Sequence, residues 1–210
     1  MFSSLRQTLF KVKKCDLIWS RLSSSSSTGT AISDYRFFLP IQTRANDNDA
    51  YSHVNNTIYN LYVDTIINNY INWYGFPNQK ETNCKRLVAH ASFDYKSSAV
   101  YPEILLGALR VDRIGRSSVQ YGSAVFTPKK QYLTFLGDDS QDPLMEIGIG
   151  VQGLITNSDD SDVIMKLMMH YNPNPCLLSK YIHVFVDGAD GKPVQKLPTN
   201  IQTGMEKISL

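Results

Sequence analysis

The residues of this chain that are best suited to chemistry lie in one polar segment, residues 44–59. It carries two carboxylates, Asp47 and Asp49, and a histidine, His53, and it leads into an apolar-faced helix that is predicted to begin at Asn56. A carboxylate can attack a carbonyl or activate water, and the unpaired N–H groups at a helix N-terminus can bind an oxyanion. The segment therefore permits acyl-transfer chemistry, although Asp and Asn before a helix also act as ordinary caps.

A long helix over residues 56–74 must position this segment. Apolar residues recur every four positions along it: Ile58, Tyr62, Ile66, Tyr70 and Tyr74. Asparagines fill much of the other side, and because asparagine is a poor helix former, burial of the apolar face must stabilise this helix. Gly75 and Pro77 are its stop signal. We interpret its aromatic residues as core rather than as a box for an aromatic substrate, because aromatic side chains dominate ordinary cores.

Strands are predicted before and after this helix, over residues 36–44, 86–95, 103–114, 117–126, 145–155 and 181–186. Proline cannot donate to a ladder, so Pro40 should begin its strand or lie where that strand is an edge. One long apolar-faced helix followed by strands suggests an α+β fold in which a sheet wraps around the helix. Residues 127–180 contain two loop-like patches and are predicted to be irregular, and residues 199–210 are predicted to form a tail.

One glycine motif in this region matches a dinucleotide-binding pattern, but its surroundings do not support dinucleotide binding. Residues 148–153 match G-x-G-x-x-G, a dinucleotide-binding pattern that works only where a strand hands over to a helix. The residues that follow predict strand and turn, so we interpret these glycines as lying in a strand.

Composition excludes several classes of protein. At 210 residues, with 42% hydrophobic and 19% charged residues, the chain is long enough for one domain and too short for two comfortable ones. It has no apolar run of transmembrane length. Its cysteines, Cys15, Cys84 and Cys176, form no C-x-x-C pair, which argues against a disulfide framework and a cysteine zinc site. We expect no metal.

Residues 1–31 differ from the rest of the chain. They hold five basic residues and one acidic residue, a balance of +4, so the other 179 residues carry −2 of the net +2. With a net charge of −2, residues 32–210 lack the excess of positive charge that is typical of nucleic-acid-binding proteins. The leader is basic, rich in Ser and Thr and amphipathic as a helix, which is typical of a mitochondrial transit peptide and predicts a location in the matrix. A disordered tail is the alternative. Either way, a single domain over residues 32–198 is left.

One stretch of the chain reads Asn46-Asp47-Asn48-Asp49-Ala50-Tyr51-Ser52-His53-Val54-Asn55-Asn56-Thr57-Ile58-Tyr59. It resembles the signature of the 4-hydroxybenzoyl-CoA thioesterase-like branch of the hot-dog superfamily. The usual form is Asp-x-Asp, two or three residues, Gly-His-Val-Asn-Asn and then Tyr. Residues 113–118 and the closing stretch 184–198 are further similarities. The resemblance covers residues 36–127 and 180–198.

This resemblance implies a curved antiparallel sheet around one central helix and acyl-CoA thioesterase activity. Asp49 would be the catalytic carboxylate, acting as nucleophile or as general base toward water. The backbone N–H of Asn56 would polarise the thioester carbonyl. His53 and Asn55 would shape the loop or orient water, and Tyr59 would line the acyl pocket.

The resemblance also bears on substrate and assembly. Arg113, Arg116 and Ser117 would contact the CoA part of the substrate, the alternative for the arginines being a solvated hairpin end. CoA enters as part of the substrate, and no further cofactor is expected. Medium or long fatty acyl groups are the default substrate. Dimers of this family place active sites at the subunit interface, which implies a homodimer or a dimer of dimers.

Two departures from the family pattern leave a second function open. Ser52 replaces the glycine before His53, so the turn must be made without a residue that takes positive φ freely. Residues 128–180 are longer than the family's usual connection. The alternative function is a non-catalytic acyl-CoA-binding protein or a subunit of a larger mitochondrial assembly. Asp49 favours the enzyme, because a pure binder needs no carboxylate there. A hydratase of the same fold is disfavoured, because His53 stands in a thioesterase-type context.

Overall fold

A six-stranded antiparallel sheet, in the order β2-β6-β4-β3-β1-β5, is the main feature of the fold. The structure is a computed structural model, and it describes residues 30–76, 83–129, 147–157 and 160–209. The strands are β1 (Phe37–Gln42), β2 (Cys84–Tyr95), β3 (Ile104–Ile114), β4 (Ser118–Phe126), β5 (Leu154–Ile155) and β6 (Leu177–Asp187). The helices are α2 (Asn56–Tyr70), α5 (Ser161–His170) and α6 (Thr199–Glu206), with the short turns η2 (Ile32–Asp34), η3 (Ala45–Asp47) and η4 (Ile71–Gly75). Residues 1–29 of the predicted leader lie outside the described residues.

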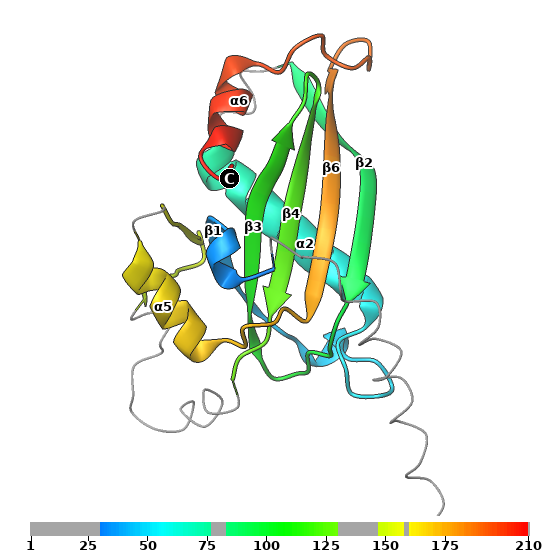
Figure 1. The fold of residues 1–210 in the computed structure, drawn as a ribbon. Coiled ribbons are helices and arrows are strands. Elements are labelled where there is room, and N and C mark those ends of the chain that lie inside the picture. Colours follow the sequence, from blue (N-terminus) through cyan, green and yellow to red (C-terminus); the bar gives the residue numbers. More distant parts are fainter. Residues whose placement is uncertain (1–29, 77–82, 130–146, 158–159, 210) are drawn as a thin grey trace, which may run out of the picture.

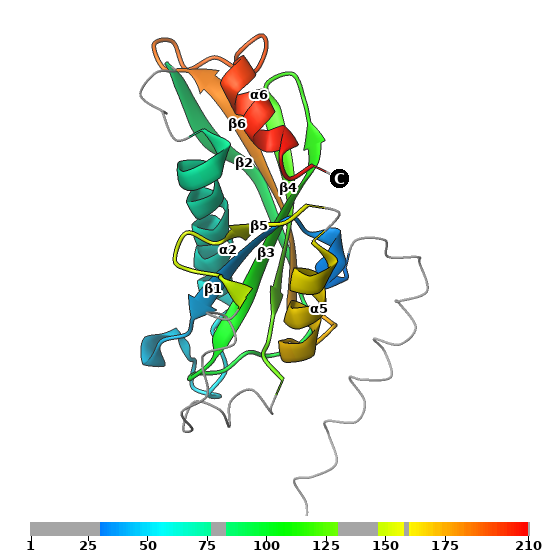
Figure 2. The same cartoon turned by 90° about the vertical axis from the view of Figure 1, so that its left-hand side faces the viewer.

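Helix α2 crosses one face of the sheet (Figure 1), and a view from the side places α5 on the opposite face (Figure 2). The side chains of α2 that are buried against the sheet are Tyr59, Tyr62, Val63, Ile66, Ile67 and Tyr70. The sequence predicted this arrangement, and the fold is the hot-dog fold. The asparagines of α2 lie mostly on its outer side, so packing of the apolar face stabilises the helix despite its poor propensity.

The end of α2 differs slightly from the predicted boundary. The α-helix ends at Tyr70, and the chain continues as one π-type turn, η4, which finishes at Gly75. The Tyr70 hydroxyl donates a hydrogen bond to the carbonyl of Gly204 in α6. The backbones of Gly75 and Gly204 are packed so closely that a Cβ on Gly204 would lie 1.7 Å from the Gly75 carbonyl oxygen.

The prediction that the chain after Pro198 forms a tail is wrong. Residues 199–206 form α6, which places Ile201, Met205 and the following Ile208 in the main core, each at most 1% exposed. The spacing of these three residues puts them on one face of a helix. That apolar face explains why the segment folds onto the end of α2 instead of remaining in solvent.

Residues 127–180 also contain more helix than predicted. Helix α5 packs Leu167 into a second apolar cluster on the outer face of the sheet, with Tyr35, Phe38 and Phe126. The predicted strand over 145–155 shrinks to Leu154–Ile155, and its residues 145 and 146 lie outside the described residues. The glycines at 148–153 are therefore not in a strand. Gly148 and Gly153 have φ of 80° and 76°, which strand geometry excludes.

The two edges of the sheet differ. Pro40 pairs with Leu106 of β3, and β5 pairs with only Phe37 and Phe38, so Pro40 lies on an edge as predicted. At the other side, the described residues pair β2 with β6 alone, and none of the twelve residues of β2 is buried. No helix among the described residues is long and apolar enough to cross a lipid bilayer.

Candidate active site

The segment between β1 and α2 folds as a tight loop. After η3, Asn48 and Val54 form an antiparallel bridge. Between them, the Asp49 N–H donates to the His53 carbonyl at 2.7 Å, and the Ser52 N–H donates to the Asp49 carbonyl at 3.1 Å. Ser52 takes φ = 62°, in the left-handed region that favours glycine. Ser52 therefore makes the turn before His53 without a glycine.

Asp47, the first carboxylate of the pair, is hydrogen-bonded and ion-paired to other groups of the protein. Its side chain accepts hydrogen bonds from the Tyr62 hydroxyl at 2.6 Å and the Arg44 backbone N–H at 2.8 Å, and it forms an ion pair with the Arg44 guanidinium at 2.9 Å. Burial raises the pKa of Asp47, but the hydrogen bonds from Arg44 and Tyr62 outweigh burial and bring the pKa below its ordinary value. At 1% exposure, this carboxylate ties the loop to α2 and cannot reach a substrate.

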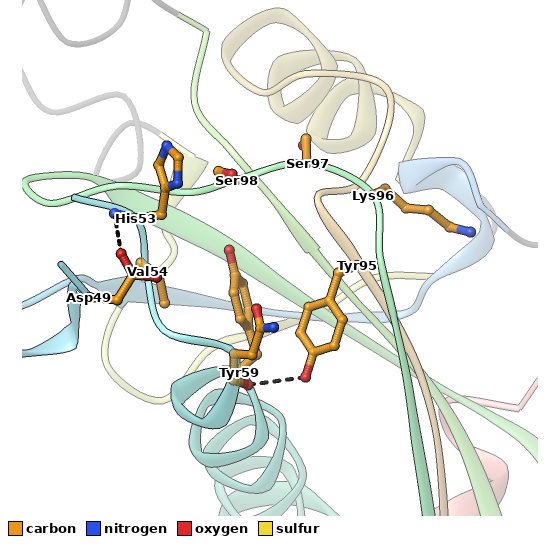
Figure 3. Close-up of a pocket in the computed structure, with 9 residues that line it drawn as sticks. Asp49, His53, Val54, Tyr59, Tyr95, Lys96, Ser97 and Ser98 are labelled. Atoms are coloured by element: carbon orange, nitrogen blue, oxygen red, sulfur yellow. Dashed lines mark hydrogen bonds between the residues drawn. The ribbon is translucent and has the colours of Figure 1, made fainter. Parts of the chain in front are cut away.

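Asp49, the second carboxylate, is partly exposed and lines a cavity (Figure 3). Its Oδ1 accepts hydrogen bonds from the backbone N–H groups of Tyr51 at 2.8 Å and His53 at 3.2 Å. These two bonds fix the position of the carboxylate. Its Oδ2 accepts no hydrogen bond from any described residue, so this oxygen is available to water or to a substrate.

The N-terminus of α2 lies beside this carboxylate. Asn55 is the N-cap: its Oδ1 accepts hydrogen bonds from the Thr57 N–H at 3.0 Å and the Thr57 hydroxyl at 3.1 Å. Within the described part of the chain, the N–H of Asn56 donates to no acceptor. The Tyr95 hydroxyl donates to the Asn56 carbonyl at 3.1 Å, which holds this first turn against β2. An unpaired N–H at a helix N-terminus is a ready donor for a developing oxyanion.

The cavity has a volume of about 240 Å³. Its lining residues are Asp49, His53, Val54, Asn56, Tyr59, Tyr95, Lys96, Ser97 and Ser98. Four predicted site residues, Asp49, His53, Asn56 and Tyr59, thus line one cavity. Asn55 lies next to it as the helix cap.

The segment at 95–98 was not predicted as part of the site. This segment begins at the last residue of β2. Nothing in its sequence indicated where these residues would lie in the fold. The Lys96 and Ser97 N–H groups donate to the Cys176 carbonyl, and the Val54 N–H donates to the Ala99 carbonyl at 2.9 Å. These bonds hold residues 95–98 opposite the loop of Asp49.

Tyr59 joins the two walls of the cavity. Its hydroxyl accepts a hydrogen bond from the Ala99 N–H at 3.1 Å, and its ring meets that of Tyr95 edge-on, with 5.7 Å between centroids. Burial, and then the neighbouring Cys176, raise the pKa of Tyr59 above its ordinary value. Tyr59 therefore stays neutral and forms one wall of the cavity.

Arg113, Arg116 and Ser117 lie elsewhere. The loop of Asp49 is joined to the start of β3 through the Thr43 N–H, which donates to the Glu103 carbonyl. These three residues lie at the far end of β3, roughly 30 Å away at about 3.3 Å per residue. Within one copy of the chain, they do not line the cavity of Asp49.

The family comparison matches this part of the chain. Residues 51–133 match the model of the thioesterase superfamily. The matched region contains His53, Asn56 and Tyr59 and begins two residues after Asp49. The resemblance to this family is confirmed. A comparison with curated protein sequences gave no match.

Solved structures share the fold. The PA5185 protein of Pseudomonas aeruginosa is 26% identical, with a TM-score of 0.60 over 86% of this chain and 96% of that one. A thioesterase of Thermus thermophilus, solved with coenzyme A and zinc, is 16% identical, with a TM-score of 0.53 over 83% of this chain and 95% of that one. A 1,4-dihydroxy-2-naphthoyl-CoA thioesterase of Synechocystis is 13% identical, with a TM-score of 0.53 over 80% and 94%. These likenesses show the fold, and the match to the thioesterase superfamily model is what points to thioester hydrolysis as the general class of activity.

Proposed function

We propose that this chain hydrolyses acyl-CoA thioesters to a free carboxylic acid and CoA, because residues 51–133 match the model of the thioesterase superfamily and the chain has the hot-dog fold. One observation carries this proposal. Asp49 and Asn56 line the same cavity, which supports a reaction in which a carbonyl meets the Asp49 carboxylate and the Asn56 N–H together.

The reaction follows from these two groups. The Asn56 N–H, at the positive end of α2, donates a hydrogen bond to the thioester carbonyl oxygen and stabilises its negative charge as the carbonyl carbon becomes tetrahedral. The free Oδ2 of Asp49 either attacks that carbon or takes a proton from a water that attacks it. The C–S bond then breaks, and the CoA thiolate leaves and takes up a proton. In the first route, water subsequently cleaves the acyl-Asp49 anhydride.

His53 and Asn55 support this geometry through the backbone and the cap. The His53 N–H holds Oδ1 of Asp49, and Asn55 fixes the first turn of α2. Their contribution is to position the two reacting groups.

The activity is tested by thiol release from acyl-CoAs of short, medium and long chain and from aromatic acyl-CoAs. Asp49→Asn should lower kcat/KM by about 10²–10⁴-fold, the usual contribution of a general base. Asp190→Asn is the matched control, because Asp190 lies in an exposed turn away from the cavity. Binding of the panel without thiol release would instead establish the non-catalytic acyl-CoA-binding protein.

We also propose that two copies pair through β2. All twelve residues of β2 are at least partly exposed, and its outer edge is unpaired among the described residues. A long unpaired edge strand is a template for pairing with another strand. In each copy, Arg113 and Arg116 lie at one end of the sheet and Asp49 lies at the other end. If two β2 strands pair in antiparallel fashion, the end with Arg113 and Arg116 in one copy comes toward the end with Asp49 in the other copy. That arrangement supports a role for these arginines in trans, as contacts for the phosphates of CoA.

The composition of residues 1–31 supports a mitochondrial location as a further part of this proposal. A fusion of residues 1–31 to a fluorescent protein should enter mitochondria and be shortened there. Residues 32–210 in the same fusion are the control, and cytosolic fluorescence of the leader fusion would contradict the assignment.

A further inference from the structure

Arg86, on β2, is a partly buried cation that forms no ion pair with any residue that the structure describes. Its Nη2 donates to Oδ1 of Asn68 on α2 at 2.8 Å, and its Nη1 is buried with no hydrogen-bond partner. The ion pairs among the described residues involve Arg44, Lys96, Arg110 and Lys192, but not Arg86. Burial lowers the pKa of Arg86 and outweighs the opposing effects of Tyr121, Asp64 and Tyr181. Buried charges in proteins are normally paired, so this one calls for an anion.

A cavity of about 380 Å³ lies against Arg86. Its lining residues are Phe76, Cys84, Lys85, Arg86, Leu87, Phe185 and Ile201. The walls therefore combine apolar side chains with two cations, and none of the lining residues that the structure describes is acidic. The Arg86 guanidinium lies over the Phe76 ring at 5.9 Å, and that ring meets Phe185 edge-on at 6.2 Å between centroids. The volume falls within the range of about 300–1,000 Å³ that is usual for small-molecule sites.

We propose that this cavity is a second binding site, which takes a small carboxylic acid with an apolar body. The carboxylate would give Arg86 the acidic partner that it lacks, and the apolar body would lie against Phe76, Phe185 and Ile201. Arginine and carboxylate pair through charge-assisted hydrogen bonds, which makes a carboxylic acid the fitting class of ligand.

Within one copy of the chain, the site is separate from the cavity of Asp49. Arg86 and Tyr95 lie nine residues apart on β2, which corresponds to roughly 30 Å at about 3.3 Å per residue. The two cavities share no lining residue. A free carboxylic acid is also what thioester hydrolysis releases, so the product of the proposed reaction belongs to the ligand class of this site. The binding itself does not depend on that reaction and is tested without it.

Cys84 provides the readout, because it lines this cavity and is partly exposed, whereas Cys176 is fully buried. The full-length chain is treated with a thiol-alkylating reagent in the presence of octanoate, and the modification of each cysteine is followed by peptide mass spectrometry. At ten times its dissociation constant, octanoate should slow alkylation of Cys84 about tenfold, because only the unoccupied fraction reacts. Free N-acetylcysteine in the same sample serves as the reference thiol, and its rate should not change.

The uncharged analogue 1-octanol tests the role of charge on the wild-type chain, and it should protect Cys84 far less than octanoate. Arg86→Gln should abolish protection by octanoate, whereas Lys180→Gln, which removes an exposed cation from the neighbouring strand β6, should retain it. Even if Arg86→Gln does not fold, the comparison of octanoate with octanol on the wild-type chain shows whether binding requires the carboxylate.

Three results would overturn the proposal. The absence of protection by octanoate would mean that the cavity holds only water. Equal protection by octanol would mean that it is an apolar hollow without a role for Arg86. Protection that rises with protein concentration in the absence of octanoate, and that octanoate does not increase, would mean that the second copy in the β2 pair covers the cavity in place of a carboxylic acid.

Discussion

Two aspartates that are separated by one residue have opposite surroundings. Asp47 is buried and bonded to Arg44 and Tyr62, whereas Asp49 keeps one oxygen free in a cavity. We therefore expect Asp47→Asn to destabilise the fold by roughly 1.5–3 kcal/mol, the range for hydrogen bonds to a charged group. Asp49→Asn should leave the free energy of unfolding within about 0.5 kcal/mol, as is usual for substitutions outside buried networks.

Urea denaturation of both variants measures this difference, with thiol release recorded on the same samples. Because the pKa of Asp47 is lowered in the folded state, its contribution to stability is complete above the ordinary aspartate pKa and is lost as pH falls through the lowered value. An Asp47→Asn variant as stable as the wild type would contradict the structural role of this residue.

Ser52 gives a second prediction at the residue scale. A non-glycine residue in the left-handed region costs of order 1 kcal/mol, and Ser52 has φ = 62°. Ser52→Gly should therefore raise the free energy of unfolding by roughly 0.5–1 kcal/mol, once the greater freedom of glycine in the unfolded chain is counted. The matched control is Ser97→Gly, in the opposite wall of the cavity, where no positive φ gives glycine an advantage. Equal effects of the two substitutions would show that Ser52 is not strained.

His183 carries a prediction about pH. It is 4% exposed on β6, between the rings of Tyr121 and Tyr181, and its Nδ1 has no hydrogen-bond partner. Burial, and then the charge of Arg86, lower its pKa from 6.5 to about 4. The unfolded chain therefore binds a proton that the folded chain excludes, and stability falls as pH drops from 6.5 toward 4.

This loss should amount to roughly 2–3 kcal/mol, at 1.36 kcal/mol for each unit of pKa difference. Urea denaturation between pH 4 and 7 measures it, and the His183→Leu chain should show a correspondingly flatter profile over that range. Parallel profiles for the two chains would rule out His183 as the source.

Sequence reasoning located one wall of the candidate site and missed the other. The loop and the N-terminus of α2 are adjacent in the sequence, so Asp49, His53 and Asn56 could be connected to one another by spacing and turn chemistry alone. The wall at 95–98 reaches the site only because β2 pairs with β6 and its exit is bonded to Cys176. That contact depends on tertiary structure, which local patterns do not record.

At the scale of elements, the periodic segments were predicted well and the short ones were not. The helix at 56–74 and the strands β2, β3 and β4 lie within a few residues of their predicted bounds, because each has a long apolar period. Helix α6 was missed although Ile201, Met205 and Ile208 have helical spacing, since eight residues after a proline resemble a tail. Helix α5 was missed because the cluster that receives Leu167 is formed by η2 and the outer face of the sheet.

The packing of α6 can be tested at its closest contact. A Cβ on Gly204 would lie 1.7 Å from the Gly75 carbonyl oxygen, and because that neighbour is backbone, α6 must shift to accommodate it. Gly204→Ala should therefore cost about 1–3 kcal/mol, the usual penalty of overpacking, even though alanine favours helix. Thr203→Ala, at an exposed position of the same helix, is the control. Urea denaturation of both chains measures the difference, and no loss in Gly204→Ala would show that residues 199–210 do not pack on α2.

At the scale of the whole molecule, the edge strand β2 is the least protected part of the sheet. Helix α2 and α6 cover the inner face, and η2 and α5 cover part of the outer face, but no described element covers the edge of β2. Val88, in the middle of this strand, is 51% exposed. Edge strands that remain unpaired usually carry lysine, which discourages pairing. If β2 pairs with its copy, Val88→Lys should introduce two close positive charges across the two-fold axis and weaken the dimer.

Light scattering during size-exclusion chromatography measures this effect. The wild-type chain should elute with twice the mass of one chain, and Val88→Lys should shift it toward a single chain as the sample is diluted. Val151→Lys provides the matched control, because Val151 is 85% exposed in a turn away from β2 and the same charge there should leave the dimer intact. If Arg113 and Arg116 act in trans, Val88→Lys should also raise KM for acyl-CoA in parallel with dissociation. A monomeric wild-type chain with full activity would contradict both the pairing through β2 and the role of these arginines.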